Sequence, residues 1–270
     1  MSDRVLITRH GAVAHVALNR PDKKNGLDAP MFEGLVAAGE AVAADPSIRA
    51  VVLGARGDCF CAGLDFQAFL AGGDAMSRKL LGERVGPANL AQRAAWIWQE
   101  LAVPVVAAIE GVAFGGGLQI AAGADLRYCT PSARFSVMEI KWGLIPDMGI
   151  TKTLTPVVRA DHLLELATTG RVVDAAEALA LGLVTRICAD PAAEALATAQ
   201  LWASKSPDAV QRTKRMLQGA RDRDVTGAFA LETALQQQIL GQHNQLEAVM
   251  ANFQKRAPEF RDANWPDRAE

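Results

Sequence analysis

The pattern of apolar and polar positions predicts strands and helices that alternate along the first half of the chain. Residues 5–21 alternate as two short strands joined by a turn at His10 and Gly11. Residues 29–48 repeat apolar positions with a helical period, and Asp45 and Pro46 end that helix. Residues 49–56 form a short, valine-rich run that is almost entirely apolar. Such a run predicts a strand that is buried on both faces.

The later pattern predicts a similar alternation and then a helical region. A long helical stretch, interrupted by glycines, runs from about Leu64 to Leu101, and residues 104–114 form a second buried strand. A short helix follows the next glycines and reaches about Gly123. Further elements are short strands at 126–130 and 133–137 and then, from Pro146 onward, mostly helix, including 174–182, 206–220 and one amphipathic stretch over 225–256.

Together these elements predict an α/β fold with a buried sheet, followed by a separate helical layer. The helical layer is suited to packing or oligomerisation. The predicted organisation is a core over residues 1–198 and a helical C-terminal region over 199–270, with a boundary that no low-complexity linker marks.

Composition indicates a globular protein and removes several functional classes. Half of the 270 residues are hydrophobic and 21% are charged, and the formal net charge is −2. This charge gives no electrostatic case for nucleic acid or an acidic membrane surface. The sequence has no apolar stretch of about 20 residues, no signal-peptide layout and no C-terminal address, so we expect a cytoplasmic protein without membrane partners. Its scattered cysteines and histidines form no metal-ligand set, and we expect no metal.

Two glycine-containing turns each follow a predicted buried strand, in residues 51–66 and 105–120. Consecutive glycines let a ligand approach backbone N–H groups, and a helix beginning near Gly117 would favour negative charge there. Such a turn could bind a phosphate or a developing oxyanion. The usual phosphate-loop and dinucleotide patterns are absent. Close packing of the strand against the helix is the alternative explanation.

Seven stretches of the sequence, in this order, resemble the crotonase superfamily, the enoyl-CoA hydratase/isomerase family. They are VALNRPDKKNGLD, CFCAGLDF, IEGVAFGGGLQIAAGADLRY, ARFSVMEIKWGLIPDMG, TGRVVDAAEALALGLV, SPDAVQRTKRML and QKRAPEF. The resemblance implies a crotonase-like spiral of ββα units with a helical C-terminal region, assembled as a homotrimer or a dimer of trimers. It also implies an acyl-CoA thioester substrate in fatty-acid β-oxidation or related acid breakdown. No separate cofactor is expected, because coenzyme A is part of the substrate.

The resemblance implies that Leu64 and Gly116 supply two backbone N–H groups to a thioester oxygen. Paired donors at a developing enolate oxygen can contribute about 3 kcal/mol or more to catalysis. Lys24, in the RPDKKN stretch, is a candidate phosphate contact, although a solvated surface lysine is the alternative. Trp142 could line an acyl pocket or could belong to the core. The full set of expected substrate-binding residues is Lys24, Ala62, Gly63, Asp65, Phe66, Gly115, Gln119 and Trp142.

The acidic residues indicate which chemistry the site could perform. Family hydratases generally hold a water between two glutamates, and the matching positions here are Glu139 and Gln119. A glutamine amide can orient water but cannot exchange protons in the useful pH range. Asp147 has the spacing from Glu139 that resembles dienoyl-CoA isomerases, although an acid in the first turn of a helix beginning at Pro146 explains it equally.

We therefore expect an isomerase in which Glu139 and Asp147 move protons. The alternatives are an ordinary enoyl-CoA hydratase and a non-catalytic acyl-CoA binding protein.

Overall fold

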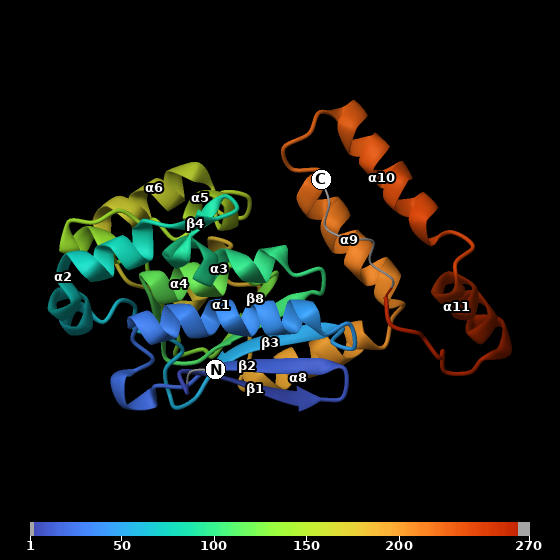
Figure 1. The fold of residues 1–270 in the computed structure, drawn as a ribbon, viewed down its shortest axis with the longest axis horizontal. Coiled ribbons are helices and arrows are strands. Elements are labelled where there is room, and N and C mark those ends of the chain that lie inside the picture. Colours follow the sequence, from blue (N-terminus) through green and yellow to red (C-terminus); the bar gives the residue numbers. More distant parts are fainter. Residues whose placement is uncertain (1–2, 264–270) are drawn as a thin grey trace.

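A six-stranded sheet lies at the centre of the computed structural model, which describes residues 3–263 (Figure 1). Its strands, in spatial order, are β1 (Val5–His10), β2 (Val13–Leu18), β3 (Ala50–Ala55), β6 (Val105–Ile109), β8 (Leu126–Cys129) and β11 (Arg186–Ile187). The first two strands form an antiparallel hairpin and the others pair in parallel. The hairpin turns at Gly11, whose φ of 63° suits glycine, and this confirms the predicted turn.

Helices cover both faces of this sheet. The larger core lies against α1 (Ala29–Ala44), α3 (Leu90–Glu100) and α4 (Gly116–Ala122), and the smaller core lies against α8 (Pro191–Ala203). Successive residues of β3 point alternately into the two cores: Val51 into the larger and Val52 into the smaller. The valine-rich run is therefore buried on both faces, as its composition predicts. The predicted boundary between residues 198 and 199 falls within α8.

The prediction of a single strand over 104–114 is wrong, because the chain bends at Gly111. This residue has a φ of 63°, and an added Cβ would lie 2.3 Å from the carbonyl oxygen of Asp58. The bend separates β6 from β7 (Val112–Phe114), which joins a second sheet with β9 (Arg134–Ser136) and β10 (Val173–Asp174). The order β6, β7, α4 is thus one ββα unit of the predicted architecture.

Glycines divide the region between residues 64 and 101 as expected. Helix α2 (Phe66–Leu81) has a kink at Gly73, and a small hairpin of β4 (Arg84–Val85) and β5 (Ala88–Asn89) turns at Gly86. Helix α3 follows directly, and Asn89 caps its N-terminus in a capping box with Gln92.

Two helix boundaries in the second half differ from the prediction. No helix begins at Pro146, because the next helix, α5 (Ile150–Thr153), begins after Gly149 in a left-handed conformation. The stretch over 225–256 is two helices, α10 (Val225–Ile239) and α11 (His243–Gln254), because the chain turns at Gly241. The remaining helices are α6 (Ala160–Thr169), α7 (Ala175–Ala180), α9 (Pro207–Gly219) and the short 3₁₀ helices η1 (Pro21–Lys23) and η2 (Glu139–Trp142).

Helices α9, α10 and α11 form an arm that projects from the layered body, which we call the C-terminal arm (Figure 1). A buried lysine of α9, Lys214, joins this arm to the body. Its ammonium donates to the carbonyl oxygens of Trp98 at 3.1 Å and Val103 at 3.0 Å. It also lies 2.8 Å from a carboxylate oxygen of Asp125. Burial lowers the pKa of Lys214, and the charge of Asp125 opposes this shift.

Replacement of Lys214 by methionine is expected to destabilise the protein strongly. The substitution leaves the Asp125 carboxylate without its cation and leaves two carbonyl groups without a donor. Breaking such a pair from one side lowers the free energy of unfolding by about 3–5 kcal/mol. Urea denaturation measures this loss. Lys152→Met, which breaks an exposed pair with Asp222, is the matched control and should change stability by about 1 kcal/mol or less. Equal losses in both variants would contradict the role of Lys214.

Candidate active site

The two glycine-containing turns lie against each other. Gly63 has a φ of 94°, and an added Cβ would lie 2.9 Å from the carbonyl oxygen of Phe114. A Cβ on Gly117 would lie 2.5 Å from the carbonyl oxygen of Cys61. Both distances are too short for a side chain, so glycine allows the two backbones to come this close. Close packing, one of the two explanations offered by the sequence, therefore accounts for glycine at both positions.

Leu64 and Gly116 lie on these neighbouring turns. Leu64 forms an isolated parallel bridge with Leu27, in which Leu27 donates to the carbonyl of Gly63 and accepts from the N–H of Asp65. The N–H of Leu64 takes no part in that bridge. An added Cβ on Gly116 would lie 2.7 Å from Leu27 Cδ1, which places α4 beside the same residue. Within residues 3–263, neither predicted donor N–H binds a protein acceptor.

Gln119 and Glu139 are joined by a hydrogen bond. Gln119 is buried in α4, and its Nε2 donates to Glu139 Oε1 at 2.6 Å. Its Oε1 accepts the backbone N–H of Met148 at 2.8 Å. A backbone N–H requires an acceptor and a carboxylate requires a donor, so these two contacts fix the orientation of the amide. Gln119 therefore presents its NH₂ group to Glu139.

The carboxylate of Glu139 lies beside the glycine turn in a poorly solvated position. An added Cβ on Gly115 would lie 3.3 Å from Glu139 Oε1. The other oxygen, Oε2, is buried and accepts no hydrogen bond from the part of the chain that the structure describes. Burial is the main cause that raises the pKa of Glu139; the hydrogen bond from Gln119 lowers it, and the charge of Asp147 raises it. Such an environment is typical of a carboxylate that exchanges protons.

Asp147 lies near Glu139 but in a different setting from the one predicted. It stands in the loop before α5, so the first-turn explanation is wrong. The residue is solvent-exposed overall, yet partial burial of its carboxyl raises the pKa of Asp147. The negative charge of Asp147 contributes to the raised pKa of Glu139. The carboxyl groups of Glu139 and Asp147 therefore lie within electrostatic range of each other.

The other predicted contacts lie against the turn that carries Leu64. Trp142 is 49% exposed and stacks on Phe66, with ring centroids 4.0 Å apart, so it is not a core residue. The side chain of Lys24 is exposed, and its carbonyl accepts the N–H of Ala62 at 3.0 Å. Asp65 uses its carboxylate within the chain, where it caps α2 through the N–H of Ala68. Asp65 therefore contributes to the site mainly through the backbone that it holds.

Sequence reasoning missed two residues that organise this site. Met148 fixes the amide of Gln119, and Leu27 joins the loop before α1 to the turn that carries Leu64. Leu27 lies inside a quoted motif, but its pairing with Leu64 depends on tertiary structure. Both contacts use backbone groups, so neither side chain signals them in the sequence.

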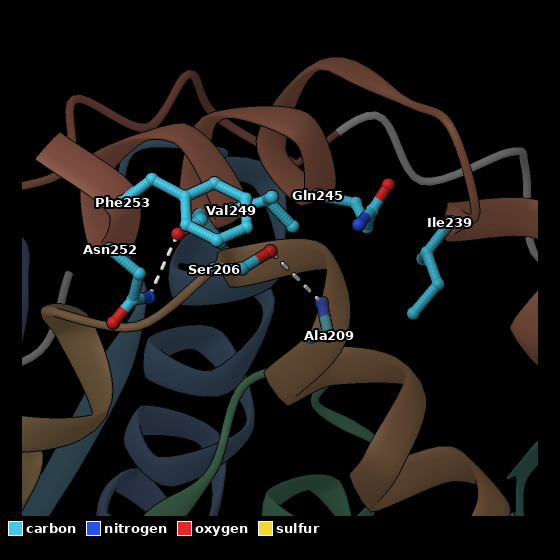
Figure 2. A pocket seen from close by; sticks show the side chains of 8 residues that line it. Ser206, Ala209, Ile239, Gln245, Val249, Asn252 and Phe253 are labelled. Carbon is cyan, nitrogen blue, oxygen red and sulfur yellow. Dashed lines mark hydrogen bonds between the residues drawn. The ribbon is translucent and has the colours of Figure 1, made fainter.

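A pocket also lies away from this site, in the C-terminal arm. Its volume is about 390 Å³, and Figure 2 shows side chains from α9 and α11 around it, with Ile239 at the end of α10. Phe253, on its rim, is 80% exposed. None of the predicted catalytic or substrate-binding residues lines this pocket. Its lining includes no acidic or basic side chain, so it lacks the proton-exchanging groups found around Glu139.

The structure also offers no helix, among residues 3–263, with the length and apolar character needed to cross a membrane.

Comparisons by sequence and by fold relate this chain to the same family of known proteins. The sequence model of the family described as "Enoyl-CoA hydratase/isomerase" matches residues 8–263. The enoyl-CoA hydratase EchA19 of Mycobacterium tuberculosis is 32% identical over 261 residues, which cover 95% of this chain and 96% of the relative. The mitochondrial Delta(3,5)-Delta(2,4)-dienoyl-CoA isomerase of Mus musculus is also 32% identical, over 90% of this chain and 77% of its own. Sequence identity therefore does not separate the two activities.

Solved structures share the whole fold. The crystal structure of an enoyl-CoA hydratase from Bacillus anthracis superposes with a TM-score of 0.89 at 25% identity, covering 96% of this chain and all of the other. An enoyl-CoA hydratase from Mycobacterium tuberculosis gives a TM-score of 0.86 at 26% identity, with coverage of 97% and 100%. The predicted crotonase-like architecture, with its central parallel-rich sheet, is confirmed.

The raised pKa of Glu139 predicts that Glu139→Gln stabilises the folded protein at neutral pH. The folded state disfavours the charged carboxylate, so the stability of the wild type falls as the pH rises from the ordinary glutamate pKa through the raised pKa of Glu139. The stability gain of the variant should therefore be present at pH 7. It should fade as the pH falls through the raised pKa toward the ordinary glutamate range. Thermal unfolding measured at several pH values checks this expectation.

Glu247→Gln is a control of opposite sign. In the wild type, hydrogen bonds donated by Arg256 lower the pKa of Glu247 to about 2. The Glu247 carboxylate therefore stabilises the fold at neutral pH and loses that effect in acid. Glu247→Gln should therefore be destabilised at pH 7 and approach the wild type as the pH falls. Parallel pH profiles for the two variants would contradict the assignment of Glu139 as a desolvated group.

Proposed function

The chain belongs to the enoyl-CoA hydratase/isomerase family, and from this premise we propose that it moves a carbon–carbon double bond within an acyl-CoA thioester in preference to adding water. The observation that carries the proposal is the hydrogen bond from Gln119 Nε2 to Glu139 Oε1. Addition of water requires a proton to leave oxygen and another to reach carbon. Relocation of a double bond requires only that one proton leave one carbon and one return to another.

Gln119 supports the isomerisation because of the way its amide is held. The two contacts to Met148 and Glu139 orient the NH₂ group toward the carboxylate. An amide in this orientation offers no proton and accepts none at ordinary pH. It also occupies the Glu139 oxygen that would otherwise hold a water between two acids. Glu139 then retains Oε2 for proton transfer.

The proposed mechanism runs through an enolate. The Glu139 carboxylate removes a proton from a carbon of the acyl chain, and the C–H electron pair moves through the conjugated system onto the thioester oxygen. The N–H groups of Leu64 and Gly116 stabilise the negative charge on that oxygen. The electron pair then returns to bond a proton at a different carbon. Glu139 or Asp147 delivers this proton, so the double bond moves with no net oxidation or hydration.

The raised pKa values of Glu139 and Asp147 suit this exchange. A catalytic acid or base works best when its pKa lies near the working pH, and both shifts are in that direction. Gly63 lets the two turns meet and Gly115 lies beside Glu139, while Phe66 and Trp142 provide an aromatic edge for the acyl chain. Lys24 is placed at the surface, where it could meet a phosphate of coenzyme A.

Hydration is the second candidate activity, because relatives of equal similarity include an enoyl-CoA hydratase. In that case Glu139 would act alone and Gln119 would orient the attacking water. A non-catalytic acyl-CoA binding protein is a third outcome, disfavoured by the raised pKa values of Glu139 and Asp147.

We also propose that several copies of the chain assemble through the C-terminal arm, as a homotrimer or a dimer of trimers. Large apolar side chains on the arm are exposed in the single chain, among them Phe229 at 62% and Phe253 at 80%. Several large apolar side chains exposed on one part of a chain support contact with another protein surface.

A panel of thioesters assayed in D₂O tests the reaction. The 2-enoyl-, 3-enoyl- and 3,5-dienoyl-CoA esters are each incubated with the protein and analysed by mass spectrometry. Deuterium uptake with a moved double bond is expected, and Glu139→Gln should lower that rate by about 10²–10⁴-fold while leaving thioester binding nearly intact. Net addition of water would support the hydratase instead. Binding without either product would support the non-catalytic protein, and unchanged turnover in Glu139→Gln would remove Glu139 from the mechanism.

Gln119→Glu tests why hydration is disfavoured. The glutamate can accept the Met148 N–H as glutamine does, and its second oxygen then lies close to Glu139. The carboxyl groups at positions 119 and 139 can then hold a water between them, and both can exchange protons. The variant is therefore expected to gain hydration of 2-enoyl-CoA. Gln119→Met, of similar size but with no polar group, is the matched control and should gain none. Absence of a gain in Gln119→Glu would show that other parts of the pocket exclude water addition.

A further inference from the structure

Arg20 is a buried arginine that no part of the proposed mechanism uses. It is 9% exposed and lies at the start of η1, in the RPDKKN stretch. Its Nη1 donates to the carbonyl of Gly26 at 2.9 Å and lies 2.8 Å from Asp65 Oδ2. Its Nε lies 3.6 Å from Asp28 Oδ2. The guanidinium faces the protein interior, which distinguishes it from the exposed Lys24 as a phosphate contact.

These contacts place Arg20 across the two segments that hold Leu64. Gly26 and Leu27 belong to one segment, and Gly63, Leu64 and Asp65 belong to the other. Leu27 bonds to the neighbours of Leu64 on both sides, at 2.8 Å to the Gly63 carbonyl and 3.0 Å from the Asp65 N–H. Arg20 binds the residue just before Leu27 and the residue just after Leu64.

Asp65 is held firmly on both of its oxygens. Oδ1 accepts the N–H of Ala68 at 3.1 Å and caps α2, and Oδ2 faces Arg20. These interactions, the Ala68 hydrogen bond first, lower the pKa of Asp65. The carboxylate therefore stays ionised and paired at neutral pH. The residue that follows Leu64 is thus fixed both to a helix N-terminus and to a buried cation.

We propose that Arg20 is a positioning residue for the oxyanion site, because its contacts with Gly26 and Asp65 fix the direction of the Leu64 N–H. The inference rests on the proposed role of Leu64 as a donor to the thioester oxygen. Loss of Arg20 leaves Asp65 with its cap but without its cation, and the bridge between Leu27 and Leu64 can then shift. Donors of this kind act only when they are correctly aligned, and a displacement of about 1 Å can lower the rate by about 10²-fold.

Binding of acetoacetyl-CoA tests this role without relying on turnover. Acetoacetyl-CoA ionises to an enolate whose near-ultraviolet absorbance reports its formation, whereas butyryl-CoA carries the same coenzyme but has no comparable enolate. Arg20→Met is expected to weaken binding of the enolate about 10- to 100-fold and to leave butyryl-CoA binding nearly unchanged. With a substrate from the thioester panel, kcat should fall by a similar factor while KM changes little.

Asp65→Asn provides a second variant that preserves the fold. Asparagine still caps α2 through Ala68, but it lacks the charge that pairs with Arg20. It should show the same selective loss of enolate affinity to a smaller degree. The double variant should lose little more than Arg20→Met alone, because both substitutions remove the same contact. If Arg20→Met does not fold, Asp65→Asn still decides the question.

Arg93→Met is the matched control. Arg93 is also partly buried and pairs with Glu40 at 2.7 Å, but it joins α3 to α1. It should lose stability without losing enolate preference. Equal weakening of both thioesters in Arg20→Met, or no weakening of either, would overturn the proposal. A wild-type protein that prefers the enolate but moves no double bond would refute the proposed function and leave the role of Arg20 intact.

Discussion

Contact between two bare backbone turns is the constraint on which the site depends. Gly63 approaches the carbonyl of Phe114, and Gly117 approaches the carbonyl of Cys61, at distances that exclude any side chain. This contact places the N–H groups of Leu64 and Gly116 on adjacent turns. It also fixes where α4 begins, and hence where Gln119 meets Glu139. A side chain at either glycine would move the proposed donors and the proton-exchanging groups together.

Local signals predicted much of the fold, and tertiary contacts decided the rest. The hairpin at Gly11, the doubly buried β3 and the glycine breaks in residues 64–101 follow from periodicity and from conformations open to glycine. The bend at Gly111 could not be predicted, because it depends on a close approach to Asp58. The loop that carries Asp147 was also missed, since proline at 146 is equally compatible with a helix start and with a turn.

The candidate site was predictable in composition but not in connectivity. Motif resemblance pointed to Leu64, Gly116, Glu139 and Gln119, and the structure places them around the same two turns. It could not reveal that the Met148 N–H turns the Gln119 amide toward Glu139, because that contact joins residues 29 positions apart through a backbone group. Nor could charge pattern alone separate the buried Arg20 from the exposed lysines that follow it.

The way in which Met148 holds Gln119 has a consequence for how this protein could change over evolutionary time. The backbone N–H needs only an oxygen acceptor, and the glutamate side chain supplies one at the same length as glutamine. Glutamine and glutamate codons differ by a single base. One nucleotide substitution could therefore exchange the amide for an acid in a frame that already fits both. Sequence similarity across the rest of the chain would then be a poor guide to which reaction a given descendant performs.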